Sequence, residues 1–181
     1  KKQLLQLNWS EVLMKKILIL VNRDVVIYNF RKELVEHLLD GGYKIYISSP
    51  NGERIDRLIE MGCIHTEARI ARHGTNLLEE FKLFLYYKRI VNEIKPDVVL
   101  SYTIKPNIYG GMACRILKVP FIANITGLGT AVENKGLMQK ITIALYRIAF
   151  KNIECLFLQN TENRQFFIEK NISVSKHRLV P

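Results

Sequence analysis

Apolar residues along the chain recur at two spacings, one typical of buried strands and one typical of helices. Residues 17–22 form a short β-branched run of the kind that becomes a strand buried on both faces. Between Phe30 and Leu39 the apolar residues follow a helical repeat, and Gly41 and Gly42 can end that helix in a left-handed conformation. The first predicted unit is therefore a strand followed by a helix.

The same alternation continues through the rest of the sequence. Strands that alternate with helices through short connections favour βαβ units and a parallel sheet with helices on both faces. We therefore predict an α/β fold, a Rossmann-like three-layer domain with a mostly parallel sheet. The further predicted strands cover residues 43–48, 63–68, 97–101, 120–126 and 154–158, the further helices cover 53–61, 77–95, 107–117, 137–151 and 162–170, and residues 178–181 have the pattern of another strand or a linker.

Length and composition fit a single packed domain. The chain has 181 residues, of which 48% are hydrophobic, and its mean hydropathy is +0.02. These values allow a substantial core and exclude wholesale disorder. Met14 followed by two lysines resembles a natural start, so we expect residues 1–13 to be an extension and residues 14–181 to form the domain. The apolar run at 17–21 is too short to span a bilayer or to serve as a secretory signal.

Basic residues outnumber acidic ones by 27 to 17, which gives a formal net charge of +10. This excess favours an anionic partner, either a nucleic acid, a phosphorylated ligand or a membrane surface. The basic residues are spread over nearly every predicted element, and no recognition-helix, RNA-binding or zinc-finger pattern occurs. We therefore expect no nucleic acid among the partners.

Cysteine and histidine spacing gives no support to a metal site. Cys63, Cys114 and Cys155 are far apart, no C-x-x-C pair occurs, and the four histidines are scattered. Reduced thiols in a cytoplasmic protein are the simplest interpretation, and we expect neither a metal nor a cofactor.

Ligands of open parallel sheets bind at the carboxyl ends of the strands, where anions also meet helix N-termini. The loop after the first predicted strand holds Asn22 and Arg23 but lacks the G-x-G-x-x-G of dinucleotide-binding proteins, and no G-x-x-x-x-G-K-[ST] occurs in the sequence. Nicotinamide, flavin and P-loop nucleotide sites therefore lose their main support.

Three further loops at this edge carry candidate ligand contacts. After strand 97–101, Lys105 precedes a proline suited to the first turn of a helix, so its ammonium would lie beside free N–H groups able to hold a phosphate. An ordinary solvated turn explains this loop equally well. After strand 120–126, two glycines allow the backbone to approach a sugar or a phosphate, or simply shape a βα turn. The third loop, residues 69–76, carries Arg69, Arg72 and His73, which could form a rim that faces an anion, and a charged surface loop is the favoured interpretation.

Two predicted helices combine a wide apolar face with basic residues. Residues 77–95 are rich in aromatic and aliphatic side chains beside lysine and arginine, and residues 137–151 contain no acidic residue. A helix of this kind can lie at an anionic lipid surface, but a helix that covers a sheet is also apolar over a wide stripe. Both interpretations stay open.

The stretch KPDVVLSYTIKPNIYGGMACRILKVPFIANITGLGTAVE at residues 95–133 resembles the amino-terminal domain of bacterial family-4 glycosyltransferases, which have the two-domain GT-B architecture. The KPN-x-YGG block joined to N-x-TGLG is the most specific part of the likeness. It extends through LQNTENRQFFIEKN and RLVP and back to the first strand, so that it covers residues 14–181.

The resemblance implies a retaining, metal-independent transfer of a sugar from a nucleotide-sugar donor. Members of this group build capsule, O-antigen or lipid-linked oligosaccharides, typically on undecaprenyl diphosphate at the inner face of the cell membrane. In such enzymes the amino-terminal domain binds the glycan acceptor and meets the membrane, and a carboxy-terminal domain binds most of the donor. We therefore expect a cytoplasmic, peripheral membrane protein whose donor domain lies outside these 181 residues, and we expect this portion to be inactive alone.

One position departs from the family. Many members have a histidine where this chain has Thr126, and a threonine cannot carry an imidazole's charge. No catalytic residue is therefore assigned. The positions carried over as substrate-facing are Asn22, Arg23, Arg72, Thr103, Lys105, Asn107, Thr126, Gly127, Leu128, Gly129 and Thr130.

Two other functions are compatible with the sequence. A nucleotide-sugar 2-epimerase has the same architecture but would isomerise the sugar rather than transfer it. A non-catalytic basic module that docks on anionic lipid would use the two basic helices alone.

Overall fold

The structure, a computed structural model, describes residues 14–70, 76–129 and 136–180. Its centre is a parallel seven-stranded sheet in the order β3-β2-β1-β4-β5-β6-β7. This confirms the predicted Rossmann-like α/β fold. The strands are β1 (Lys16–Leu20), β2 (Lys44–Ser49), β3 (Ile64–Glu67), β4 (Val98–Tyr102), β5 (Phe121–Ile125), β6 (Cys155–Leu158) and β7 (His177–Leu179).

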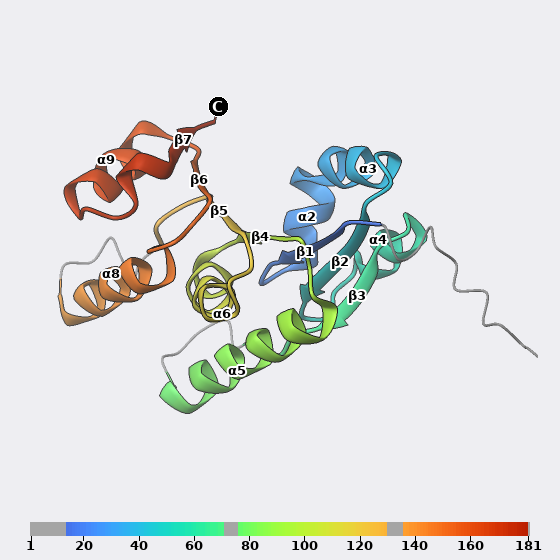
Figure 1. Ribbon diagram of the computed structural model, residues 1–181, viewed down its shortest axis with the longest axis horizontal. Coiled ribbons are helices and arrows are strands. Elements are labelled where there is room, and N and C mark those ends of the chain that lie inside the picture. Colours follow the sequence, from blue (N-terminus) through green and yellow to red (C-terminus); the bar gives the residue numbers. More distant parts are fainter. Residues whose placement is uncertain (1–13, 71–75, 130–135, 181) are drawn as a thin grey trace, which may run out of the picture.

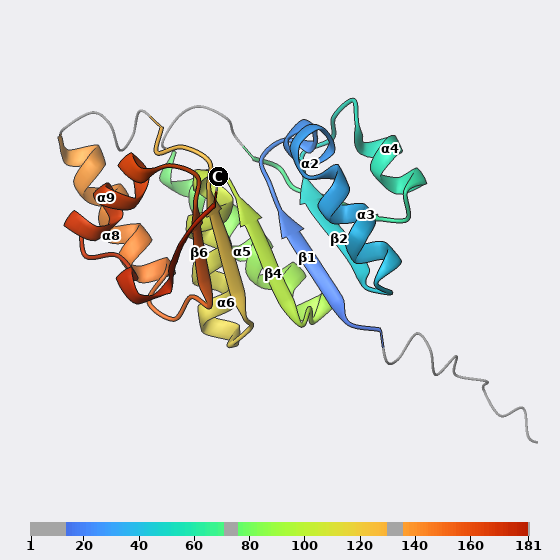
Figure 2. The ribbon, with the colours of Figure 1, turned by 90° about the horizontal axis from the view of Figure 1, so that it is seen from above.

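Helices cover both faces of the sheet, as Figures 1 and 2 show for α2 and α3 on one side and α5 and α6 on the other. The central strand β1 is buried on both faces, which explains its nearly continuous apolar sequence, whereas β4 is fully buried on one face and half-buried at Val98 and Leu100 on the other. The helices are α2 (Asp24–Phe30), α3 (Lys32–Asp40), α4 (Ile55–Glu60), α5 (Leu77–Ile94), the π-helical turn η1 (Pro106–Gly110), α6 (Gly111–Leu117), α8 (Leu137–Ala149), α9 (Thr161–Glu169) and the short 3-10 turn η2 (Val174–Lys176).

Two apolar clusters fill the space between the layers. One packs β1, β2 and β4 against α2, α3 and α4 through residues such as Ile27, Val35 and Leu58. The other packs the opposite face against α5, α6, α8 and α9, where Tyr146 and Phe167 lie 5.5 Å apart by ring centroid. The two clusters make the sheet the rigid middle layer of the domain.

The helix predicted to start near Phe30 is the second of two. α2 ends at Phe30 and α3 starts at Lys32, because the backbone of Arg31 leaves helical values with φ −138° and ψ 12°. Seven residues are too few to display a helical repeat, so α2 was not visible in the apolar pattern.

The KPN-x-YGG block packs η1 tightly against the sheet. A Cβ at Gly110 would overlap the side chain of Leu20 in β1, and a Cβ at Gly111 would lie 3.0 Å from the ring of Phe121 in β5. Small residues are required here because the helix backbone runs close over the strands. The start of η1 is thereby fixed at the carboxyl end of β4.

Candidate functional site

The candidate site lies at the carboxyl edge of β1, β4 and β5. The strand order reverses between β1 and β4, because β2 and β3 continue to one side and β5 to β7 to the other. In open α/β sheets the crevice outside such a switch point is where ligands bind. The loops that follow β1, β4 and β5 all meet there, as the sequence predicted.

The loop after β1 is tied to the rest of the edge by a carboxylate. Asn22 is half-buried, Arg23 is exposed, and Asp24 is 5% exposed at the start of α2. Asp24 Oδ2 accepts a hydrogen bond from the backbone N–H of Arg54 at 2.6 Å, which connects this loop to the one that follows β2. A Cβ at Gly52 would overlap the Asp24 carboxylate, so a glycine is needed at that position.

The loop after β4 has an unusual backbone. Thr103 has a φ of 73°, in the left-handed region that non-glycine residues seldom adopt. Pro106 occupies the first turn of η1, as predicted, and the N–H of Asn107 donates to the carbonyl of Thr103 at 3.0 Å. Single π-helical turns such as η1 occur often at functional sites.

Asn107 is the buried centre of this loop, with 1% of its surface exposed. Its Nδ2 donates to the backbone carbonyl of Asn124 in β5 at 3.1 Å. Because the amide nitrogen is used in this way, Oδ1 is the atom left for other contacts, and it has no partner among the described residues. The side chain thus joins the ends of β4 and β5 and still offers a hydrogen-bond acceptor.

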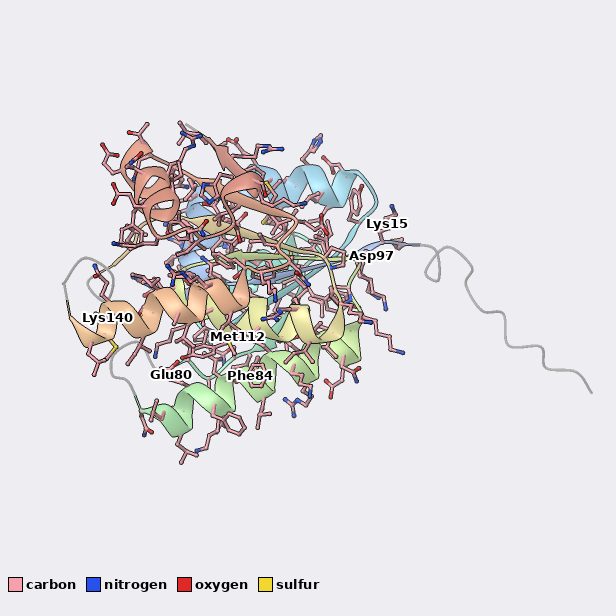
Figure 3. The ribbon with its side chains drawn as sticks, turned by 60° about the vertical axis from the view of Figure 1, so that its left-hand side comes forward. Lys15, Glu80, Phe84, Asp97, Met112 and Lys140 are labelled. Atoms are coloured by element: carbon pink, nitrogen blue, oxygen red, sulfur yellow. The ribbon has the colours of Figure 1, made fainter. Side chains whose placement is uncertain are left out.

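Lys105 pairs with a residue that the sequence analysis did not single out. Its Nζ lies 2.5 Å from Oε1 of Glu80 in the first turn of α5, and the two side chains are 22% and 12% exposed. The ammonium is therefore directed at a carboxylate as well as located at the start of η1. Figure 3 shows Glu80 and Phe84 on α5, on the side of that helix toward Met112 of α6.

Tyr109 in η1 lies beside the same carboxylate. Burial, followed by the charge of Glu80 and a hydrogen bond to it, raises the pKa of Tyr109 well above its usual value. Glu80 could have been found from the sequence, because positions 80, 83, 87 and 91 follow one helical repeat and the last three are buried. That repeat directs Glu80 inward, toward η1.

The loop after β5 approaches the loop after β4. A Cβ at Gly129, which has a φ of 68°, would lie 2.7 Å from the side chain of Ile104. Gly127 has no heavy atom within 4 Å of such a position, and both Thr126 and Gly127 are exposed. Leu128 packs partly against the apolar core. Gly127 therefore presents an open stretch of backbone, whereas Gly129 is required for packing.

Two predicted contacts lie outside the described residues, namely Arg72 and Thr130. Of the remaining predicted positions, the structure brings Asn22, Thr103, Lys105 and Asn107 to one edge and Thr126, Gly127, Leu128 and Gly129 to the adjoining loop.

Buried polar atoms without a partner are concentrated at this edge. Ten such side-chain atoms occur in the described residues, and six of them are oxygens from the ends of β1, β4 and β5, from η1 and from the first turn of α5. A buried polar atom without a partner costs about 1–3 kcal/mol and calls for an explanation, such as a ligand. The six are Asn22 Oδ1, Glu80 Oε2, Ser101 Oγ, Thr103 Oγ1, Asn107 Oδ1 and Asn124 Oδ1.

The cysteines lie apart from this edge as free thiols. Cys63 and Cys114 are buried, and burial raises the pKa of Cys63 to about 11 and that of Cys114 to about 12. Both thiols therefore stay protonated and unreactive at neutral pH. In the described part of the chain no group of three or more metal-ligating residues occurs.

The two basic helices have outer surfaces that are apolar near the site. α5 and α8 follow loops from the carboxyl edge, and their first turns expose Leu77 (83%), Phe81 (56%), Leu137 (75%) and Ile141 (44%). The inner faces are buried in the core, as expected of helices that cover a sheet. Across the described residues, no helix combines the length and the apolar character needed to cross a bilayer.

Comparison with known proteins identifies the class of this fold. The sequence model of the glycosyl transferase 4-like family matches residues 16–160. The chain is similar to the N,N'-diacetylbacillosaminyl-diphospho-undecaprenol alpha-1,3-N-acetylgalactosaminyltransferase of Campylobacter jejuni, with 23% identity over 158 residues that cover 84% of this chain and 42% of that protein.

Solved structures show the same architecture. A glycosyltransferase from Rickettsia africae superimposes with a TM-score of 0.72 and 17% identity, covering 92% of this chain and 42% of that one. The UDP-GlcNAc 2-epimerase of Methanocaldococcus jannaschii gives 0.62 and 17%, covering 92% and 45%. The chain thus spans less than half the length of the proteins that it matches.

Proposed function

This chain belongs to the glycosyl transferase 4-like family, and from that premise we propose that it is the acceptor-binding, amino-terminal domain of an enzyme that transfers a sugar from a nucleotide-sugar donor. The glycan acceptor in this proposal is carried on undecaprenyl diphosphate and belongs to capsule, O-antigen or related surface polysaccharide synthesis. The name of the Campylobacter relative, a transferase that acts on a diphospho-undecaprenol-linked sugar, supports a lipid-linked acceptor. The observation that carries the proposal is the group of six buried oxygens at the switch point of the sheet that have no hydrogen-bond partner in the described part of the chain.

The proposed mechanism is electrostatic. Hydrogen-bond donors stabilise the departing diphosphate while the hydroxyl of the glycan acceptor attacks on the same face of the sugar, so that the configuration is retained. The exposed backbone at Gly127 and the exposed cationic side chain of Arg23 are suited to the phosphate groups. The oxygens of Asn107 and Thr103 are suited to sugar hydroxyls.

The test is product analysis with the complete protein. A panel of labelled nucleotide-sugars is incubated with undecaprenyl-diphosphate-linked N-acetylhexosamine, and the lipid fraction is examined for an added sugar. Label in the lipid fraction supports the transferase. A nucleotide-sugar inverted at C2, with no label in the lipid, would instead assign the epimerase activity. The 181 residues alone should transfer nothing, because they contain only one wall of a two-domain cleft; transfer by this portion would contradict that part of the proposal.

The membrane part of the proposal places the enzyme at the inner face of the cell membrane. The first turns of α5 and α8 present exposed Leu77, Phe81, Leu137 and Ile141, and the exposed basic residue Lys140 lies on the same turns of α8. Apolar side chains that enter the interface beside basic ones are the usual elements of anionic membrane binding. These first turns adjoin the candidate site, so docking there would present the site to a lipid-linked acceptor.

Vesicle co-sedimentation tests this docking surface. The double variant Leu77→Glu/Phe81→Glu should weaken binding to phosphatidylglycerol-containing vesicles by at least about tenfold, since each buried large apolar side chain contributes about 1.5–3 kcal/mol. Ile116→Glu is the matched control, because Ile116 is 54% exposed near the end of α6, away from this edge. If the protein does not bind vesicles at low salt, whatever their content of anionic lipid, the membrane surface is ruled out.

A further inference from the structure

The unpartnered oxygens of the site are not the kind of atoms that bind a phosphate. A phosphate is recognised by N–H and ammonium donors, whereas these six atoms are carboxylate, amide and hydroxyl oxygens. When ionised, Glu80 Oε2 can only accept a hydrogen bond, and Asn107 Oδ1 is an amide oxygen, which also only accepts. The bond from Asn107 Nδ2 to the carbonyl of Asn124 identifies which end of that amide is the oxygen. Four of the six oxygens can only accept hydrogen bonds, and the hydroxyls of Ser101 and Thr103 can also accept them, so a sugar, which offers O–H and N–H donors, suits this group.

Glu80 holds a special position within this group. Its helix is started by Asn76, whose side chain accepts from the N–H of Leu78 at 3.0 Å, and the N–H of Glu80 donates to the Asn76 carbonyl at 3.0 Å. The side chain is therefore fixed at its base by the first turn of α5. At its tip, Oε1 pairs with Lys105 and the Tyr109 hydroxyl lies beside the carboxylate, while Oε2 is buried without a hydrogen-bond partner among the described residues.

The ion pair of Glu80 stands apart from the other ion pairs of the described residues. The other four join exposed side chains three or four positions apart in one helix, each side chain at least 45% exposed. The pair of Glu80 and Lys105 joins α5 to the loop after β4 and is mostly buried. Burial of two charges costs desolvation energy that their attraction only roughly offsets, so a stability role explains this pair poorly. A role in holding the carboxylate in one orientation explains it better.

We propose that Glu80 is a substrate-binding residue whose free carboxylate oxygen accepts a hydrogen bond from a hydroxyl of the glycan acceptor. Lys105 fixes the carboxylate through the opposite oxygen, and Asn107 offers a second hydrogen-bond acceptor on the neighbouring loop. The inference rests on the proposed transferase function and names the group that recognises the acceptor sugar.

Steady-state kinetics of the complete protein test the assignment. Glu80→Gln keeps the shape of the side chain and removes its charge, so the KM for the glycan acceptor should rise roughly 10- to 100-fold, as expected for one hydrogen bond to a charged group. The KM for the nucleotide-sugar should not change. Glu79→Gln is the matched control, because Glu79 is the preceding residue, is exposed, and pairs with Lys82 at 2.8 Å on the outer surface of α5.

Deoxygenated glycan acceptors separate recognition from structural support. The acceptor that lacks the recognised hydroxyl should be poor with the wild type and no poorer with Glu80→Gln, because the two changes remove the same hydrogen bond. A variant that lowers the melting temperature and kcat while leaving the acceptor KM unchanged would show that Glu80 only supports the fold, and would overturn the inference.

A failure of the proposed function gives a different result. If the wild-type complete protein transfers no sugar, saturation-transfer NMR with free N-acetylglucosamine and its disaccharide measures the subsite directly. Binding that is lost in Glu80→Gln and kept in Glu79→Gln would uphold the sugar site without the transferase. No binding by the wild type in that experiment would overturn the site as well.

Discussion

Two carboxylates lie at the carboxyl edge of the same sheet, each in the first turn of a helix, and their surroundings differ. Asp24 begins α2, accepts from the N–H of Arg54 at 2.6 Å and is enclosed by Gly52. Glu80 lies in the first turn of α5 and has one oxygen on Lys105 and one buried oxygen with no partner among the described residues. The carboxylate of Asp24 therefore joins two loops on one side of the switch point, whereas the carboxylate of Glu80 keeps one oxygen available on the other side.

The difference separates a structural polar group from a ligand-binding one. A buried carboxylate that is enclosed by backbone groups contributes to folding, and its loss is felt as lost stability. A carboxylate that keeps a buried oxygen without a partner destabilises the free protein by an amount that a bound hydroxyl can offset. Mutations at the two ends of the edge should accordingly affect different measurements.

The largest effect is expected at Gly52. The substitution Gly52→Ala places a methyl group where the Asp24 carboxylate lies, so that either the loop after β2 or the start of α2 must move. We expect a loss of about 2 kcal/mol in the free energy of unfolding, typical of an overpacked contact that also disturbs a hydrogen bond. Urea denaturation followed by circular dichroism measures it.

Two variants control this result. Gly127→Ala introduces the same methyl group where no heavy atom lies within 4 Å, and stability should stay within about 0.5 kcal/mol of the wild type. In an Asp24→Ala background, Gly52→Ala should cost much less, because the overlapping group has been removed. An equal cost in both backgrounds would show that the contact between Gly52 and Asp24 is not what constrains this loop.

The sequence predicted the fold well because the apolar period differs between buried strands and helices. Six strands and the order of the elements followed from that pattern, and the switch-point rule then identified the loops that hold Asn22, Thr103 and Asn107. The pattern did not reveal α2, whose seven residues include only two buried ones, Asp24 and Ile27. A short helix with so few buried positions has almost no period to detect.

The partner of Lys105 could not be read from residue types alone. Two glutamates stand next to each other at 79 and 80, and one turns outward to Lys82 while the other turns inward to Lys105. The apolar repeat of α5 places position 80 on the inner face of the helix, but only the packing of α5 against η1 makes Lys105 its partner. The same holds for the aromatic residues of α5, where Phe81 is 56% exposed and Tyr87 is fully buried. Composition shows that such a helix is amphipathic, and the tertiary structure decides which residues remain outside.

A second and smaller effect is expected from a buried imidazole far from the site. His177 in β7 is 8% exposed, its Nε2 donates to the carbonyl of Ile172 at 2.7 Å, and its Nδ1 is buried without a partner in the described structure. Burial lowers the pKa of His177, and the charge of Arg164 adds to this, while the hydrogen bond to Ile172 opposes it. The neutral ring is therefore favoured in the folded protein.

The sign of the pH effect follows from this direction. The pKa is lower in the folded state than in the unfolded chain, where it is about 6.5, so the unfolded chain takes up a proton first as the pH falls. Stability should be fully present above pH 6.5 and should decline below it, by at most about 1.4 kcal/mol per pH unit from this group. Urea unfolding at pH 7.5, 6.5 and 5.5 gives the free energy of unfolding as a function of pH. This free energy should fall less steeply with decreasing pH in His177→Gln than in the wild type; identical slopes would contradict the assignment.

The smallest effect is expected from Tyr146→Phe, which compares an unpartnered oxygen in the core with the unpartnered oxygens at the carboxyl edge. The hydroxyl of Tyr146 is buried without a partner among the described residues, and burial raises the pKa of Tyr146 well above its usual value. The centroid of its ring lies 5.1 Å from that of Phe150 and 5.5 Å from that of Phe167. Tyr146→Phe removes an oxygen that no ligand can reach, so the loss of a small packing volume is offset by the removal of an unsatisfied polar group. We expect the free energy of unfolding to change by less than about 1 kcal/mol, with a gain favoured, and sugar transfer by the complete protein to stay at the wild-type level. If Tyr146→Phe instead raised the acceptor KM as Glu80→Gln is expected to do, an unpartnered buried oxygen would no longer mark the sugar site, and the contrast between Asp24 and Glu80 would lose its functional meaning.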